Sequence, residues 1–401
     1  MEQPVRIKNM GLRGLAVADT KISFIDGEKG ILIYRGFRIE DLAKNSNFME
    51  TAFLLLMGRL PDKSEAEAFK RQVVEARRVP AFVLETLRLL PSNAHPMDVL
   101  QATVPLLATA DPDLRDETRD GNVRKAVRLI ARLPVVIAAW DRIRKGKDIL
   151  DPNPSLGHAA NFLWMLHGEN PSASMARALD TCLVLHADHT FNASTFACRE
   201  VVSTRAHMYA GVAAGVGALS GELHGGANAR VMKMLKSLEN VDDVAGWVRE
   251  RLDRKERIMG MGHAVYKTTD PRANILKEIS ARLGEETGQP QWWRISKTIE
   301  EVALEELEKR GKKDIKPNVD FYSASVYHVM GIPADLMTGI FALSRIAGWC
   351  AHIIEEKFAE AQEKPMLYRP TAEYVGDYCG PVGCTYVPPE EREQAAGVPS
   401  A

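Results

Sequence analysis

Two histidines stand in settings that suit proton-transfer chemistry. His224 precedes a Gly-Gly turn, and a helix is expected to begin near Ala227. A helix N-terminus disfavours protonation of a nearby histidine, and a neutral imidazole can donate a hydrogen bond to a carbonyl oxygen that becomes an enolate. His263 follows two alternating glycines and Arg272 comes nine residues later, so both side chains can grip one carboxylate. A structural role on a loop is the alternative for each.

Asp320 and Arg345 are a candidate base and a candidate anion-binding group. Asp320 follows the Pro-Asn turn at 317–318 and has apolar and aromatic neighbours. Desolvation there raises the carboxyl pKa and makes the group a competent base near neutral pH. A helix cap is its structural alternative. Arg345 lies on an otherwise apolar helix, where a guanidinium needs an anionic partner, either a ligand or an internal carboxylate.

His186 and His189 are three residues apart, so they share one helix face or one helix end. They could form half a zinc site, but the sequence has no HExxH motif and no cysteine at ligand spacing. We therefore predict no metal, with one histidine packed inside and the other facing a cleft. A zinc hydrolase that uses both histidines is the alternative.

The composition is that of an ordinary globular protein and excludes several classes of partner. The 401 residues are 45% hydrophobic and 26% charged, with a net charge of -1. A chain this balanced has no overall field to hold nucleic acid or an anionic membrane. Its longest nearly apolar run, at about 208–219, is shorter than the roughly 20 residues that span a bilayer. We expect neither nucleic acid nor a membrane as a partner.

The cysteines and the N-terminal residues predict a cytoplasmic location. Irregular spacing favours free thiols in a reducing compartment for the five cysteines, which are Cys182, Cys198, Cys350, Cys379 and Cys384. The first eight residues contain no apolar stretch typical of a signal peptide.

Nearly all of the remaining pattern is helical. Apolar residues recur at helical spacing, including a segment at 122–145 that we expect to be kinked or broken at Pro134. The exception is a predicted hairpin of 21–25 and 31–34 around an Asp-Gly turn, which is too small to form a domain. A βαβ rhythm and a repeat of 20–50 residues are both absent from the sequence, so Rossmann, TIM-barrel and solenoid folds are disfavoured.

Together these segments resemble the citrate synthase family over nearly the whole chain. Each motif is weak alone, but their order and spacing in combination are specific. The stretches that carry the resemblance are HADH at 186–189 with NAST at 192–195, LHGGAN at 223–228, GHAV at 262–265 with DPR at 270–272, NVD at 318–320 and Ser344-Arg345. The resemblance is to the dimeric, type I members.

The resemblance implies an all-α, multi-helical fold with a minor N-terminal β-hairpin. It also implies a division into a large domain and a smaller mobile one. Residues 1–222 would form the first part of the large domain, and residues 223–323 the small domain. Residues 324–401 would complete the large domain and add a C-terminal extension.

The resemblance further assigns a role to each candidate residue. Asp320 matches the base that removes a methyl proton from acetyl-CoA, His224 the group that hydrogen-bonds the thioester oxygen, and His263 the group that polarises the ketone of oxaloacetate. The positions that match oxaloacetate-binding residues are His189, Asn228, Arg272, Arg345 and Arg369. The looser matches to CoA-binding residues are Lys267, Lys313 and Asn318.

The implied enzyme is an acyltransferase that condenses acetyl-CoA with oxaloacetate through an enol and hydrolyses citryl-CoA to citrate and CoA, at the entry to the tricarboxylic acid cycle. The reaction needs no metal and no redox cofactor. The implied partners are oxaloacetate, acyl-CoA and a second identical subunit, which supplies Arg369 across the interface of a homodimer. Simple exposure in an irregular C-terminal segment is the alternative for Arg369.

Two alternative functions stay open at this point. A 2-methylcitrate synthase uses propionyl-CoA instead, and one methylene in a pocket is worth only ~1–3 kcal/mol of discrimination. A non-catalytic helical interaction protein would instead show repeats or an exposed apolar stripe. Three residues depart from common family residues and bear only on subfamily and substrate preference, namely Glu222, Ala264 and Ala324.

Overall fold

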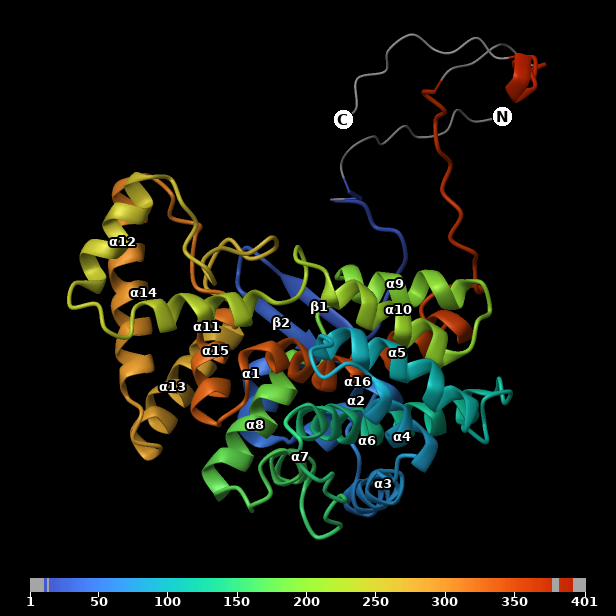
Figure 1. Cartoon of the computed structure of the whole chain (residues 1–401), viewed down its shortest axis with the longest axis horizontal. Coiled ribbons are helices and arrows are strands. Elements are labelled where there is room, and N and C mark those ends of the chain that lie inside the picture. Colours follow the sequence, from blue (N-terminus) through green and yellow to red (C-terminus); the bar gives the residue numbers. More distant parts are fainter. Residues whose placement is uncertain (1–10, 13, 377–381, 392–401) are drawn as a thin grey trace. The chain divides into compact units, whose positions relative to one another are not determined.

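The computed structural model of the chain describes residues 11–12, 14–376 and 382–391. They divide into two compact units, one ending at Leu367 and one beginning at Tyr368. The first unit is built almost entirely of helices (Figure 1), so the prediction of an all-α fold is confirmed. In the second unit, the described residues form one short 3-10 helix, η2 (Pro389–Glu391).

The described part of the chain holds sixteen α-helices. In chain order they are α1 Ile39–Asn45, α2 Phe48–Met57, α3 Lys63–Glu75, α4 Ala81–Leu89, α5 Pro96–Thr109, α6 Arg119–Arg144, α7 His158–His167, α8 Ala173–His186, α9 Ala193–Ser203, α10 Met208–Ser220, α11 Ala227–Ser237, α12 Val244–Asp253, α13 Pro271–Glu286, α14 Gln291–Lys309, α15 Val319–Val329 and α16 Met337–Phe358. A 3-10 turn, η1 (Ala334–Leu336), leads directly into α16.

A small antiparallel sheet precedes the helices and has the strand order β1-β2-β3. The predicted hairpin is confirmed as β1 (Ser23–Asp26) and β2 (Ile31–Tyr34), with Ser23 opposite Tyr34. A two-residue strand, β3 (Phe37–Arg38), extends the sheet beyond the prediction.

Helix α16 forms the centre of the core and is buried along nearly its whole length. It packs against α2, α6, α8, α9 and α10, which surround it in the lower and right-hand parts of Figure 1. Within the described residues, η1 and α16 together form the one stretch long and apolar enough to cross a membrane, by length and composition alone. Because 94% of its most apolar window is buried inside the protein, core packing accounts for that composition.

Helices α11 to α15 form a separate group at the left of Figure 1. Their most extensive contacts are with one another, between α13 and α15, α12 and α14, and α11 and α15. They meet the rest of the protein mainly through α1, α8, η1 and α16. The segment 223–323 that we expect to form a smaller domain contains α11 to α14 and the first part of α15, and the division itself stays a prediction.

Two details of the sequence analysis need correction. Helix α6 continues through Pro134, so a break there is wrong, while a kink stays a prediction; packing against α5, α7 and α16 holds both sides of the proline together. Cys384 is disulfide-bonded, so the prediction of free thiols is wrong there, and Cys379 lies outside the described residues. Sequence spacing does not report the distance between two sulfur atoms, and that distance decides whether they bond. The buried cysteines Cys182, Cys198 and Cys350 are free.

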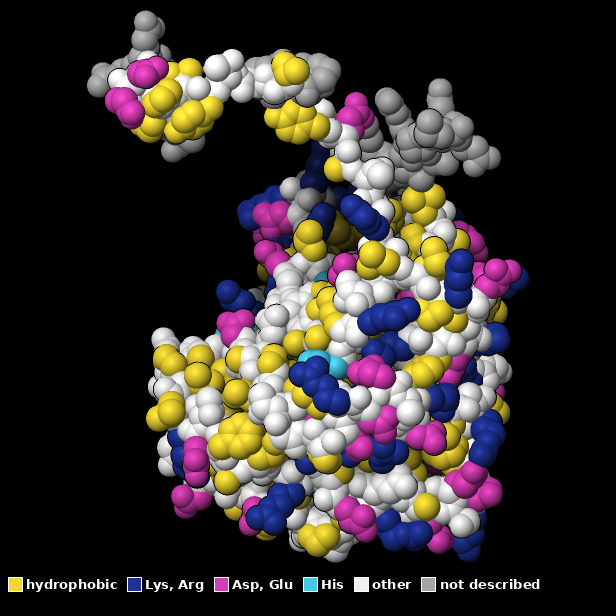
Figure 2. All heavy atoms as spheres, turned by 90° about the vertical axis from the view of Figure 1, so that its right-hand side faces the viewer, with side chains coloured by type: hydrophobic (Ala, Val, Ile, Leu, Met, Phe, Trp, Pro, Cys, Tyr) yellow, Lys and Arg dark blue, Asp and Glu magenta, His cyan; other side chains and the backbone are white. Residues whose placement is uncertain are grey.

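The surface that faces the right-hand side of Figure 1 carries acidic and basic side chains interspersed with apolar ones (Figure 2). Charges of opposite sign alternate over this face rather than gathering in one field. This distribution agrees with the near-zero net charge and offers no basic surface there for a polyanion.

Candidate active site

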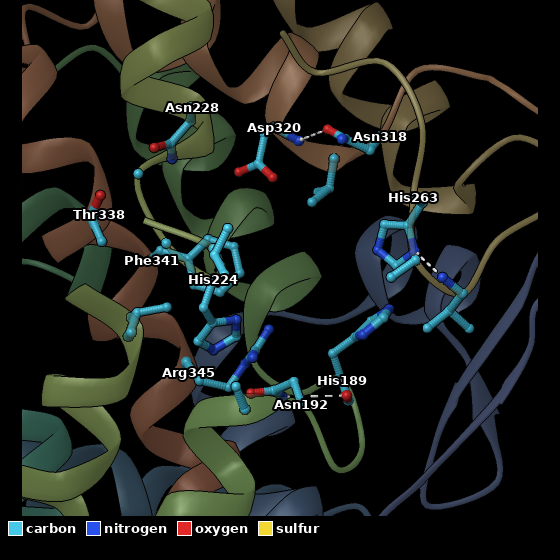
Figure 3. Close-up of a pocket in the computed structure, with 18 of the residues that line it drawn as sticks. His189, Asn192, His224, Asn228, His263, Asn318, Asp320, Thr338, Phe341 and Arg345 are labelled. Atoms are coloured by element: carbon cyan, nitrogen blue, oxygen red, sulfur yellow. Dashed lines mark hydrogen bonds between the residues drawn. The ribbon is translucent and has the colours of Figure 1, made fainter. Parts of the chain in front are cut away.

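A pocket of about 410 Å³ lies where three loops meet the beginnings of five helices, α9, α11, α13, α15 and α16. One loop joins α8 to α9, the second joins α10 to α11, and the third joins α12 to α13. Side chains from α15 and α16 complete the wall (Figure 3). The predicted site residues that line it are His189, His224, Asn228, His263, Arg272, Asn318, Asp320 and Arg345.

His224 is held as a neutral imidazole with a defined tautomer. Its Nε2 accepts a hydrogen bond from the backbone N–H of Ser194 at 3.1 Å and lies 2.8 Å from the Ser194 hydroxyl. Because a backbone N–H can only donate, Nε2 carries no proton, and the hydrogen is on Nδ1. Burial and then the charge of Arg345 lower the pKa of His224 to about 4. The expectation of a neutral His224 therefore agrees with the structure, although burial rather than a helix terminus is the main cause.

The support for His224 continues into the core. The Ser194 hydroxyl accepts from the indole N–H of Trp349 at 3.1 Å, and its single hydrogen is shared between two acceptors at 2.8 Å, Nε2 of His224 and the Asn192 side-chain oxygen. Asn192 also caps α9 by accepting from the backbone N–H of Thr195. The cap and the histidine are thus fixed by one network at the start of α9.

His263 has the opposite tautomer. Its Nδ1 accepts from the backbone N–H groups of Val265 at 3.0 Å and Tyr266 at 3.2 Å. The neutral ring therefore carries its hydrogen on Nε2. Burial and then the charge of Arg272 lower the pKa of His263 to about 4.

His189 lies beside His263 on the right of Figure 3, with the ring centres 5.4 Å apart. Its Nε2 is 3.3 Å from the hydroxyl of Tyr266. Burial and then the charge of Arg272 lower the pKa of His189 well below its ordinary value. His186 is instead buried: its Nδ1 donates to the Cys182 carbonyl at 2.7 Å, and its ring packs on Phe341. The two histidines thus divide as predicted, one in the core and one at a cleft.

Two buried arginines line the pocket, and they differ in whether a carboxylate of the protein is paired with the guanidinium. Arg272 pairs through Nε and Nη2 with the Asp270 carboxylate at 2.9 and 2.8 Å, and against the lowering effect of burial this partner raises the pKa of Arg272. Among the described residues, the one hydrogen-bond acceptor of Arg345 is the carbonyl of His186, at 2.9 Å. No carboxylate among the described residues lies within ion-pair distance of it, and burial lowers the pKa of Arg345 to about 10. A buried cation without a paired anion favours an anionic ligand.

Asp320 lies in the first turn of α15 and faces the pocket from the side opposite His224 (Figure 3). Its backbone N–H is capped by the side-chain oxygen of Asn318 at 3.0 Å, and the Asn318 amide donates to the carbonyl of Gly262 at 2.8 Å. Burial raises the pKa of Asp320 to about 6, against the lowering effect of Arg272. The carboxyl is therefore poised to accept a proton near neutral pH.

Asn228 supplies a side-chain amide donor to the wall of the pocket. The side chain is buried, and its Nδ2 has no hydrogen-bond partner within the described part of the chain. A buried amide left without a partner is costly, so a ligand acceptor in the pocket would stabilise it.

Three predicted residues do not line this pocket. Lys267 is exposed, and Lys313 is exposed and pairs with Glu308 at 3.1 Å. Arg369 is exposed and belongs to the second compact unit. The CoA-binding roles of the two lysines and the substrate-binding role of Arg369 stay predictions.

Several residues of the site were not predicted as such. Ser194 and Trp349 fix His224, Tyr266 lies between two histidines, and Thr338 and Phe341 complete the wall. Ser194 is inside a quoted motif, which was the available signal. The others are ordinary core residues in the sequence pattern and acquire their place only through tertiary contacts.

Metal ligation has no obvious place in this arrangement. Within the residues that the structure describes, no group of three or more His, Cys, Asp or Glu side chains could hold a metal ion. His186 and His189 face different surroundings, so they do not converge on one ion.

The chain matches known proteins along nearly its whole length. Residues 11–371 match the family model described as citrate synthase, C-terminal domain. The chain is 46% identical over 372 residues to the citrate synthase of Haloferax volcanii, covering 92% of this chain and 95% of that protein. 2-Methylcitrate synthases match at lower identity: that of Shewanella oneidensis is 36% identical over 377 residues, covering 94% and 97%.

Solved structures give the same result. The crystal structure of citrate synthase from Pyrobaculum aerophilum superposes with a TM-score of 0.89 at 36% identity, covering 98% of this chain and 100% of that chain. The Thermoplasma acidophilum enzyme, solved as a ternary complex with carboxymethyl coenzyme A and oxaloacetate, gives a TM-score of 0.86 at 34% identity, covering 95% and 98%.

Proposed function

The chain belongs to the citrate synthase family, and we propose that it joins the methyl carbon of acetyl-CoA to the ketone carbon of oxaloacetate and hydrolyses the product to citrate and CoA. The observation that carries this proposal is the pairing of Asp320 and His224 across one pocket. A carboxyl with a raised pKa faces a neutral imidazole whose hydrogen is fixed on Nδ1. These are the two groups that enolisation of a thioester requires.

Enolisation is the difficult step, because a carboxylate in water is far too weak a base for a thioester α-proton. In the pocket, the Asp320 carboxylate takes a methyl proton while the Nδ1–H of His224 donates to the thioester oxygen, where negative charge develops. A donor held in advance stabilises that charge without reorganisation, and exclusion of water strengthens the interaction.

Carbon–carbon bond formation takes place on the side of the pocket that carries His263. The enol carbon attacks the ketone carbon, and the ketone oxygen gains negative charge and a proton. The Nε2–H of His263 is the donor for that oxygen. Arg272 and Arg345 bind the two carboxylates of oxaloacetate, with His189 and the unpartnered amide of Asn228 as neutral donors.

The finer assignments belong to the same proposal. Lys267, Lys313 and Asn318 are proposed CoA contacts, on the strength of the sequence resemblance. The reaction so described uses side chains and water, without a metal or redox cofactor. The enzyme is a homodimer in which Arg369 of the partner subunit completes the oxaloacetate site, which agrees with the exposure of Arg369. The three buried free cysteines support a cytoplasmic location, whereas the disulfide-bonded Cys384 does not.

A thiol-release assay with oxaloacetate tests the function directly. Acetyl-CoA and propionyl-CoA are compared at equal concentration, with oxaloacetate omitted as the control. We expect oxaloacetate-dependent release that is faster with acetyl-CoA. A preference for propionyl-CoA would move the assignment to 2-methylcitrate synthase, whose sequences match at lower identity. Release with neither substrate would contradict the proposal.

A further inference from the structure

The β1–β2 hairpin contacts both segments that carry the histidines on the oxaloacetate side of the pocket, although no residue of either strand lines it. We propose that this hairpin is a positioning element that fixes His189 and His263 relative to each other. The inference rests on the proposed function, because its consequence is measured as oxaloacetate affinity.

The strands hold the turn that carries His189. The buried hydroxyl of Tyr34 donates to the carbonyl of Asp188 at 2.8 Å and accepts from the Asp188 N–H at 3.1 Å. The Ser23 hydroxyl donates to the Asp188 carboxylate and accepts from the N–H of Thr190 at 3.1 Å. Thr190 has a φ of 48°, an unfavourable left-handed conformation for a β-branched residue. The strands thus hold a strained turn directly beside His189.

The tip of the hairpin holds the loop that carries His263. The N–H of Lys267 donates to the carbonyl of Gly27 at 2.9 Å. A Cβ atom on Gly27 would lie 2.2 Å from the carbonyl oxygen of Val265, so only glycine permits this approach of two backbones. The N–H of the same Val265 donates to Nδ1 of His263. The tip therefore lies against the Val265–Tyr266 peptide, whose own N–H also donates to Nδ1 of His263.

Tyr266 contacts both histidines and so links the two segments. Its N–H donates to Nδ1 of His263, and its hydroxyl lies 3.3 Å from Nε2 of His189. One hairpin thus contacts both segments of a pair of rings whose centres are 5.4 Å apart. Loosening the hairpin lowers the fraction of molecules in which both rings face the ketone. The apparent affinity for oxaloacetate is then the intrinsic affinity multiplied by that fraction.

The test is Gly27→Ala in the full-length enzyme, assayed by CoA release. The new methyl group pushes the tip away from Val265. We expect KM for oxaloacetate to rise about tenfold while kcat at saturating oxaloacetate stays within about threefold, because excess substrate restores the competent population. The matched control is Gly157→Ala, at a site with a φ of -59° and nothing within 4 Å of the added Cβ. It should leave both constants unchanged.

A merely structural role for the hairpin would lower thermal stability without separating KM from kcat. A folded Gly27→Ala enzyme whose KM stays within about twofold of wild type therefore overturns the inference. If Gly27→Ala does not fold, Tyr34→Phe carries the test, since it removes only a hydroxyl: a raised oxaloacetate KM supports the inference and an unchanged one overturns it. Absence of oxaloacetate-dependent release from the wild type overturns the proposed function and this inference with it.

Discussion

Asp320 and His224 face each other in charge states that burial has set. Burial raises the pKa of the carboxyl to about 6 and lowers that of the imidazole to about 4. At pH 7 to 8 the carboxyl is mostly an ionised base and the imidazole a neutral donor. The same burial that makes the base strong also makes its ionised form costly to the fold.

Asp320→Asn tests the base while keeping the shape of the side chain. We expect kcat to fall by about a thousandfold, because proton transfer by a positioned group contributes on that scale. Oxaloacetate should still protect the variant against thermal unfolding, since the arginines that bind it are intact. Loss of that protection would mean that Asp320 supports the structure instead.

The pH dependence of the reaction follows from the same carboxyl. A base must be ionised, so kcat/KM for acetyl-CoA should fall about tenfold per pH unit below a midpoint of about 6. Bound oxaloacetate adds negative charge and moves this midpoint upward. Without bound oxaloacetate, His224 and His263 are neutral above about pH 5, so they do not titrate in the same range as Asp320. A midpoint below pH 5 would contradict the role of Asp320.

Folding stability should depend on pH in the opposite direction to kcat/KM: the contribution of Asp320 decreases as pH rises. The pKa of Asp320 is higher in the folded protein than in the unfolded chain, so its contribution is fully present below pH ~4 and is lost as pH rises through ~6. The melting temperature of Asp320→Asn should therefore equal or exceed that of wild type at pH 8, with the difference vanishing at low pH.

Arg345 is buried beside the pocket without an ion-paired carboxylate among the described residues, and its replacement should chiefly affect oxaloacetate. Arg345→Leu should raise KM for oxaloacetate about a hundredfold, the scale for losing one partner of a buried charge pair. Arg77→Leu is the matched control, because Arg77 is also buried, donates to two backbone carbonyls and lies outside this pocket. It should lose stability without changing KM. An unchanged KM in Arg345→Leu would refute the binding role.

At the scale of elements, the beginning of α15 decides where the base lies. Asn318 caps the helix and also ties it to the carbonyl of Gly262, next to His263. Asn318→Ala should destabilise the protein by about 1–2 kcal/mol and also lower kcat, since the cap positions Asp320. Asn47→Ala removes the cap of α2, far from this pocket, and should cost similar stability with kcat unchanged. Equal kcat in both variants would mean that the cap has no role in catalysis.

The sequence predicted elements better than it predicted their continuity or contacts. Helical periodicity and the Asp-Gly turn were sufficient for the helices and the hairpin. Pro134 was misleading, because the packing that keeps α6 continuous comes from distant helices. The same reason hid Trp349, whose hydrogen bond to Ser194 joins residues 155 positions apart. Local patterns carry no information about such partners.

At the scale of the whole molecule, the pocket draws on residues from 189 to 345, so only the complete fold assembles it. Motifs on Gly and Pro turns revealed these residues individually. Their placement around one cavity, and the absence of Lys267 and Lys313 from its lining, required the structure. Arg369 belongs to the second compact unit and is not among the residues that line this pocket.

Mixing two inactive variants tests whether Arg369 of the partner subunit completes each site. In a mixed dimer of Arg369→Ala and Asp320→Asn chains, one site combines an intact Asp320 with an intact Arg369, and the other site lacks both. Random pairing of co-expressed chains gives half mixed dimers, so activity should recover to about one quarter of wild type in the whole mixture and to about one half in the purified mixed dimer. If Arg369 serves its own chain, every site in the mixture lacks one residue, and activity stays at the average of the two parents. Co-expression with two different affinity tags, followed by sequential purification of the mixed species, separates these outcomes without relying on subunit exchange.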